Sequence, residues 1–193
     1  MTTYFVPEAE LARLLTESSG YSVFAPVQTG PDSSGLAWLD SVDSAISLEV
    51  LSQPRPAQSP KGLFLPATES MGRYGSDASA AVATETAKVL LVGVRACELR
   101  ARNYLDKVLL EGDFDDPSYS RRREQTAIVS CDCVDCTETC CCTLVGGKPF
   151  ATEGYDLNLT PIDGGFVVEA VTEKGEALLG ETKPAEATAD QLA

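Results

Sequence analysis

The cysteines of this chain are concentrated in one short segment. Six of the seven lie between Cys131 and Cys142, and the seventh, Cys97, follows an apolar run upstream. Thiolates packed this closely repel one another unless a cation or an inorganic cluster neutralises them, and few chemistries use such an arrangement. The fold must therefore bring these thiols together, and the sequence predicts a metal centre.

The chain contains no histidine. This excludes Ser-His-Asp and Cys-His nucleophile arrangements and mixed cysteine/histidine zinc sites. The segment Met1–Glu8 lacks the basic and apolar regions of a signal peptide, so we expect a cytoplasmic protein. Clustered cysteines in a reducing compartment indicate metal ligands, and an odd number cannot all pair in internal disulfides.

Charge and hydropathy restrict the partners. The formal net charge is -14, which opposes binding to nucleic acid. The longest strongly apolar run, Val89–Val94, is too short to span a bilayer, so no membrane insertion is expected.

The apolar pattern predicts an α/β fold. Lys88–Arg95 is nearly continuously apolar, as in a strand buried on both faces, and a helix is expected at Glu98–Leu110. A second apolar run, Thr126–Val129, leads into the cysteine segment. We expect a mixed sheet with flanking helices, forming a single iron–sulfur domain over residues 1–179 and a flexible tail over 180–193. Further elements are expected at 8–17 and 173–179 (helices) and at 21–27, 36–39, 155–160 and 166–171 (strands, the last two forming a hairpin).

Two of these runs end just before cysteines. If they are neighbouring strands, Cys97 and the cysteine segment meet at the sheet edge where open α/β folds place their sites, on loops beyond the strands. In extended backbone, Cys140 and Cys142 would share a face that Cys141 does not. A four-thiolate iron–sulfur cluster is favoured over a four-cysteine zinc site and over a redox-active Cys133/Cys136 pair. Cys141 is expected to be a spectator, and Cys131 and Cys136 to be spectators or alternates.

Six motifs, in order, resemble the N-terminal domain of the 4Fe–4S dicluster hydrogenase beta-subunit family, to which one of the subunits of anaerobic sulfite reductase also belongs. They cover most of residues 10–180, and no single one is decisive. The motifs are Ser59–Ser70, Gly93–Ala101, Asp113–Thr126, Thr139–Pro149, Gly154–Thr160 and Thr172–Glu176.

The resemblance implies an electron-transfer subunit with one 4Fe–4S cluster and no catalytic site of its own. By position in the motifs, the ligands would be Cys97, Cys133, Cys140 and Cys142, with Cys131 as the fallback for Cys133. The expected partners are a flavin-containing reductase subunit or ferredoxin domain and a catalytic subunit of an anaerobic oxidoreductase. The family carries a C-terminal ferredoxin domain that we do not find here, and it has an aromatic residue at the position of Cys141.

Three other positions in the motifs have alternative interpretations. Lys61 and Glu69 are expected to pair with each other rather than to act at the cluster. Arg95 either tunes the cluster by charge and hydrogen bonds or caps neighbouring carbonyls. The arginines at 121–123 form either a docking patch or ordinary surface charge.

Overall fold

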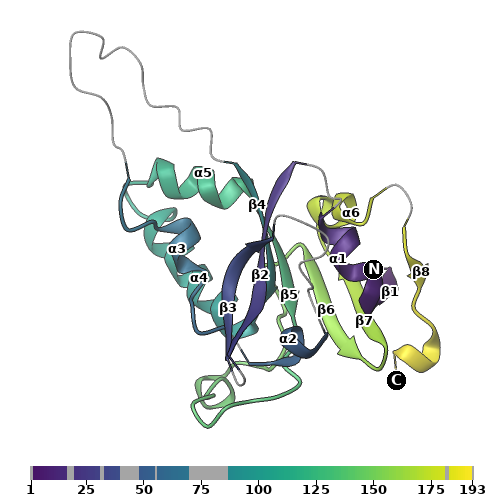
Figure 1. Ribbon diagram of the computed structural model, residues 1–193. Coiled ribbons are helices and arrows are strands. Elements are labelled where there is room, and N and C mark those ends of the chain that lie inside the picture. Colours follow the sequence, from purple (N-terminus) through teal and green to yellow (C-terminus); the bar gives the residue numbers. More distant parts are fainter. Residues whose placement is uncertain are drawn as a thin grey trace.

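An eight-stranded mixed sheet forms the centre of the molecule (Figure 1). The computed structural model describes residues 2–16, 20–30, 33–39, 48–54, 56–69, 87–180 and 183–192. The strand order is β3-β2-β4-β5-β6-β7-β1-β8, and β8 contributes only two residues. The strands are β1 (Thr3–Pro7), β2 (Tyr21–Gly30), β3 (Ser33–Leu39), β4 (Lys88–Val94), β5 (Thr126–Cys131), β6 (Leu157–Ile162), β7 (Gly165–Ala170) and β8 (Ala185–Glu186).

Helices cover both faces of this sheet. One hydrophobic cluster packs under α1 and α6, and another packs under α3, α4 and α5, which lie on the opposite side (Figure 1). The helices are α1 (Glu8–Thr16), α2 (Leu48–Ser52), α3 (Lys61–Phe64), α4 (Ala96–Leu109), α5 (Pro117–Gln125) and α6 (Glu173–Leu178), with short 3-10 turns η1 (Thr143–Val145) and η2 (Ala189–Gln191). The predicted α/β class with flanking helices is confirmed.

The strands that lead to the cysteines are parallel neighbours, which fulfils the condition under which the sequence places Cys97 and the cysteine segment at one edge of the sheet. β4 pairs with β5, and these strands lie between β2 and β6, which are also parallel to them. Leu90 and Val92 enter one hydrophobic cluster, whereas Leu91 enters the other, so β4 is buried on both faces. The carboxyl ends of β4 and β5 therefore meet at the same edge of the sheet.

Gly93 interrupts the regular pairing at the end of β4. Its φ of 77° lies in the left-handed region, and the register with β5 shifts between Val92 and Val94. A Cβ at this position would meet side-chain atoms of Leu51 and Pro26 at 2.9 Å. This bulge sets the direction in which the chain continues to Arg95 and Cys97.

Several elements differ from the sequence-based expectations. Helix α4 begins at Ala96 rather than at Glu98, which places Cys97 in its first turn. Strand β1 and helix α5 were not predicted. The hairpin of β6 and β7 is confirmed. The small, polar residues of the segment 75–86 predict a surface loop, and this segment lies outside the described residues.

The predicted tail contributes the last strand of the sheet. Ala185 and Glu186 in β8 pair with β1, and Ala187 N donates to Thr3 O at 3.0 Å. The mobility of residues 180–193 stays a prediction.

Across the part of the chain that the structure describes, no helix is long and apolar enough to cross a membrane.

Candidate functional site

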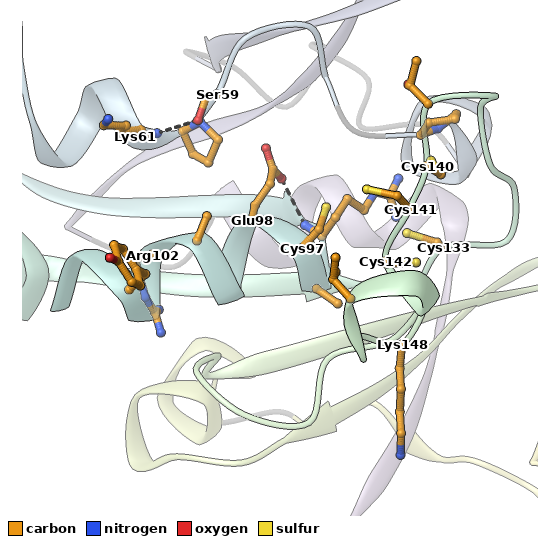
Figure 2. Close-up of a pocket in the computed structure, with 18 of the residues that line it drawn as sticks. Ser59, Lys61, Cys97, Glu98, Arg102, Cys133, Cys140, Cys141, Cys142 and Lys148 are labelled. Atoms are coloured by element: carbon orange, nitrogen blue, oxygen red, sulfur yellow. Dashed lines mark hydrogen bonds between the residues drawn. The ribbon is translucent and has the colours of Figure 1, made fainter. Parts of the chain in front are cut away.

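A cavity of about 600 Å³ opens at the carboxyl ends of β4 and β5. The beginning of α4, the connector around Ser59 and Lys61, and the cysteine segment after β5 surround it. Five thiols gather at one end of this cavity, and Ser59 and Lys61 lie across from them (Figure 2). The five are Cys97, Cys133, Cys140, Cys141 and Cys142, which include all four predicted ligands.

Cys97 lies at the N-terminus of α4. It is the second residue of a 14-residue helix, and it is exposed. The unpaired backbone N–H groups and the dipole at a helix N-terminus favour negative charge there. Cys97 is therefore placed where the helix favours negative charge on a side chain.

Cys133 interacts electrostatically with the other three predicted ligands. Its backbone N–H donates to Pro149 O at 2.8 Å, which closes the cysteine segment back onto the end of β5. Burial raises the pKa of the Cys133 thiol, the Arg95 guanidinium lowers it, and the nearby thiols of Cys97, Cys140 and Cys142 raise it again. The four groups would therefore repel one another as thiolates.

Cys140 receives hydrogen bonds from the turn that precedes it. Thr137 N donates to Cys140 Sγ at 3.3 Å, the Thr137 hydroxyl lies 3.4 Å from the same sulfur, and Cys140 N donates back to Thr137 O at 2.9 Å. Donors aimed at a sulfur stabilise negative charge on it. Sequence reasoning did not identify Thr137, although its position three residues before Cys140 is a pattern that can be searched for.

Cys142 is the N-cap residue that precedes the 3-10 turn η1. Its φ and ψ of -54° and -44° are helical, and its carbonyl accepts from Gly147 N at 2.7 Å. The argument that an extended backbone gives Cys140 and Cys142 a common face therefore does not hold. Cys141 also lines the cavity, and its sulfur points toward the other thiols in Figure 2.

The two remaining cysteines of the segment lie away from the cavity lining. Cys131 is 2% exposed, belongs to the hydrophobic core, and places its sulfur 3.6 Å from Leu51 O. Burial raises the pKa of the Cys131 thiol to about 11, against the opposing effect of Arg95. Cys136 is exposed and is not among the residues that line the cavity.

Arg95 connects the site to the rest of the fold. Its side chain is 1% exposed and lines the cavity. Nη1 donates to Cys131 O at 3.1 Å and to Asp132 O at 2.9 Å, and Nη2 donates to Leu51 O and Gln53 O. Arg95 therefore caps neighbouring carbonyls, as one of its two interpretations predicted, and its role at a cluster stays a prediction.

The charged groups around the Ser59 connector are arranged differently from the prediction. Glu69 pairs with Arg122 on α5, not with Lys61, because α5 brings Arg122 beside the end of α3. Arg123 pairs with Asp106 on α4 at 3.3 Å. Arg122 and Arg123 therefore link α5 to the end of α3 and to α4, and a docking role for the arginines at 121–123 stays a prediction.

The thiols surround a space rather than converging on a point. Among the described residues, no three or more acidic, histidine or cysteine side chains are grouped closely enough to hold a single metal ion. All seven cysteines lie in the described part of the chain, where no disulfide joins any two of them.

Comparison with known proteins identifies an informative relative. Sulfhydrogenase 2 subunit beta of Pyrococcus furiosus is 34% identical to this chain over 96 residues. The chain is a distant homologue of a hydrogenase beta subunit. The match covers 50% of this chain and only 28% of the sulfhydrogenase protein, and it confirms the resemblance inferred from the motifs. No protein family and no solved structure in the comparisons matches the chain.

Proposed function

We propose that this protein is an electron-transfer subunit that carries one 4Fe–4S cluster within an anaerobic oxidoreductase complex of the hydrogenase or sulfite-reductase type. The observation that carries the proposal is the single cavity lined by Cys97, Cys133, Cys140 and Cys142. These are the four cysteines that the motifs select.

The donor set suits an iron–sulfur cluster. Thiolates are the usual ligands of such clusters, and the four cysteines come from two separate segments that enclose a cavity. The arrangement of the thiols around a cavity, with no described group of three placed to hold one metal ion, supports a multi-atom core more than a single zinc ion.

The residues of this chain would hold the cluster and set its properties. When bound, the cluster supplies reversible one-electron transfer. The N-terminus of α4 stabilises negative charge at Cys97, and Thr137 does the same at Cys140 by hydrogen bonds. The pairing of β4 with β5 and the hydrogen bonds of Arg95 to the carbonyls of Cys131 and Asp132 hold the two cysteine-bearing segments beside each other.

The homology to a hydrogenase beta subunit supports the proposed context. We place the iron–sulfur domain at residues 1–179 and treat 180–193 as a tail. The partners would be a flavin-containing reductase subunit or ferredoxin domain, which exchanges electrons with the cluster, and a catalytic subunit. A cytoplasmic location is part of the same proposal.

The ligand set is tested by four single Cys→Ser substitutions in protein purified without oxygen. Replacing Cys97, Cys133, Cys140 or Cys142 is expected to remove most of the bound iron and acid-labile sulfide, because each supplies one iron ligand. Iron and sulfide analysis, visible absorption and low-temperature EPR after reduction measure the loss.

The matched control is Cys136→Ser, which lies in the same segment outside the cavity lining. It should keep the full iron and sulfide content. Stoichiometric zinc with no labile sulfide in the wild-type protein would instead establish a zinc-stabilised docking module without a redox role. Loss of the cluster in Cys141→Ser but not in Cys140→Ser would overturn the ligand assignment.

A further inference from the structure

Arg95 carries a buried positive charge that no described carboxylate neutralises. The four groups that accept its hydrogen bonds are backbone carbonyls, which carry no net charge. None of the ion pairs among the described residues includes Arg95. Burying an ion without a counter-charge is strongly unfavourable, so this arrangement is suited to an anionic neighbour.

Two acidic residues that contact Arg95 through backbone groups, Asp132 and Glu98, have carboxylates engaged by other donors. The carboxylate of Asp132 accepts hydrogen bonds from Asn158 Nδ2 at 3.2 Å and from the Thr160 hydroxyl at 2.6 Å. Glu98 Oε2 accepts from the backbone N–H of Arg95 at 3.1 Å. Both contacts direct these carboxylates to partners other than the guanidinium.

The guanidinium also retains a donor that no described group uses. Arg95 Nε is buried and has no hydrogen-bond partner, and the side chain lines the cavity together with the thiols. Cys133 lines the same cavity as Arg95, so the guanidinium and this proposed ligand border one space. Arg95 is therefore a buried cation placed within range of the expected thiolate charge.

We infer that Arg95 is a positioning residue that raises the reduction potential of the proposed thiolate-bound cluster by supplying its buried counter-charge. The inference rests on the proposed function. Reduction adds one electron from a reduced flavin or a second iron–sulfur centre, so the site gains one negative charge, while no proton moves and no bond to Arg95 forms or breaks. A fixed cation stabilises the more negative state more strongly, because attraction grows with charge.

The test compares the midpoint potentials of iron-loaded wild type, Arg95→Gln and Arg95→Lys by anaerobic spectroelectrochemical titration. Arg95→Gln removes the charge, and its reduced-to-oxidised ratio at a fixed potential should fall about tenfold, which corresponds to about 59 mV. Arg95→Lys keeps the positive charge but loses the planar guanidinium and its several N–H donors. Its reduced-to-oxidised ratio at the same potential should stay within about threefold of wild type.

Arg100→Gln is the matched control. Arg100 lies on α4, the helix for which Arg95 is the N-cap residue, and its guanidinium donates to Val145 O at 2.6 Å, close to the cysteine segment. Unlike Arg95, Arg100 is exposed. Its charge is screened by solvent, so this variant should shift the ratio less than about twofold.

The outcomes separate the two proposals. An Arg95→Gln protein with full iron and sulfide content and the wild-type potential would overturn the role of Arg95 and leave the proposed function intact. If Arg95→Gln does not fold, the Arg95→Lys variant tests the inference. A tenfold fall in its reduced-to-oxidised ratio would overturn the inference, because it would show that the contacts with the carbonyls, and not the charge, set the potential. Wild-type protein without iron and sulfide would refute both proposals.

Discussion

Asp106 on α4 organises a charged network at the packing of α4 against α5. It accepts a hydrogen bond from the Tyr119 hydroxyl at 2.5 Å, and it forms ion pairs with Arg102 at 3.4 Å and Arg123 at 3.3 Å. Tyr119 is fully buried in the cluster on that face of the sheet. Individual residues of this kind hold α4, and with it Cys97, in place.

Tyr119→Phe should lower the free energy of unfolding by about 1–3 kcal/mol, because it removes a buried hydrogen bond to a charged acceptor. Urea unfolding at neutral pH measures the change. Tyr104→Phe is the matched control, since the Tyr104 side chain is 70% exposed, and it should change stability by less than about 0.5 kcal/mol.

The same variant tests the titration of Tyr119. Burial, and then the hydrogen bond and charge of Asp106, raise the pKa of Tyr119 above its ordinary value of 10.0. The contribution of this raised pKa to the free energy of unfolding is complete below pH 10. It is lost as the pH rises above 10, because the tyrosine of the unfolded chain loses its proton first. The stability difference between wild type and Tyr119→Phe should therefore narrow above pH 10. A difference that widens there would contradict the assignment.

At the scale of elements, helix α5 shows how a short polar helix is specified. Asp116 is its N-cap and accepts from the backbone N–H groups of Ser118 and Tyr119, both at 2.9 Å, and Pro117 follows at the first helical position. An Asp followed by Pro is a helix-start signal that the sequence contains. The low apolar content of residues 117–125 obscured it, since only Tyr119 among them is buried.

Asp116→Ala should lower the free energy of unfolding by about 1 kcal/mol, because it leaves two N–H groups at the start of α5 without their acceptor. Thermal or urea unfolding measures this. Asp115→Ala makes the same change at the exposed neighbouring position and should be close to neutral. Equal losses in the two variants would show that general charge, not capping, is responsible.

At the scale of the whole molecule, the surface and the interior act on the site in opposite directions. The chain has a net charge of -14, which opposes adding an electron to the proposed cluster. Arg95 opposes that field from within, where salt screens it little. The two contributions can be separated by ionic strength.

Raising the salt concentration from about 0.1 M to about 1 M shortens the screening length from about 10 Å to about 3 Å. The midpoint potential of the iron-loaded protein should become less negative, because the surface carboxylates are screened. The difference between wild type and Arg95→Gln should persist at high salt. If the difference in midpoint potential between the two proteins disappeared at high salt, the charge of Arg95 would be acting as a screened surface charge, which contradicts the inference.

The sequence by itself determined the α/β class, the strands β4 and β5, and the β6–β7 hairpin, because continuous apolar runs and an Asp-Gly turn are local patterns. The parallel pairing of β4 with β5 came from the structure. The sequence also selected Cys97, Cys133, Cys140 and Cys142, a ligand set that awaits the iron analysis. It did not predict β1, because a segment of five residues carries too little pattern to indicate a strand. Pairing with β7 and β8 stabilises this segment as a strand.

The tertiary structure alone decided how the thiols are distributed. Cys131 and Cys133 are two residues apart, yet one is buried in the core and the other lines the cavity, because the chain leaves the sheet between them. Cys141 lines the cavity together with Cys140 and Cys142, and the backbone at Cys142 is helical rather than extended, contrary to the conformation that the sequence argument assumed. The contacts of Arg95 with Leu51 and Cys131 join positions far apart in the chain, and only packing places them together.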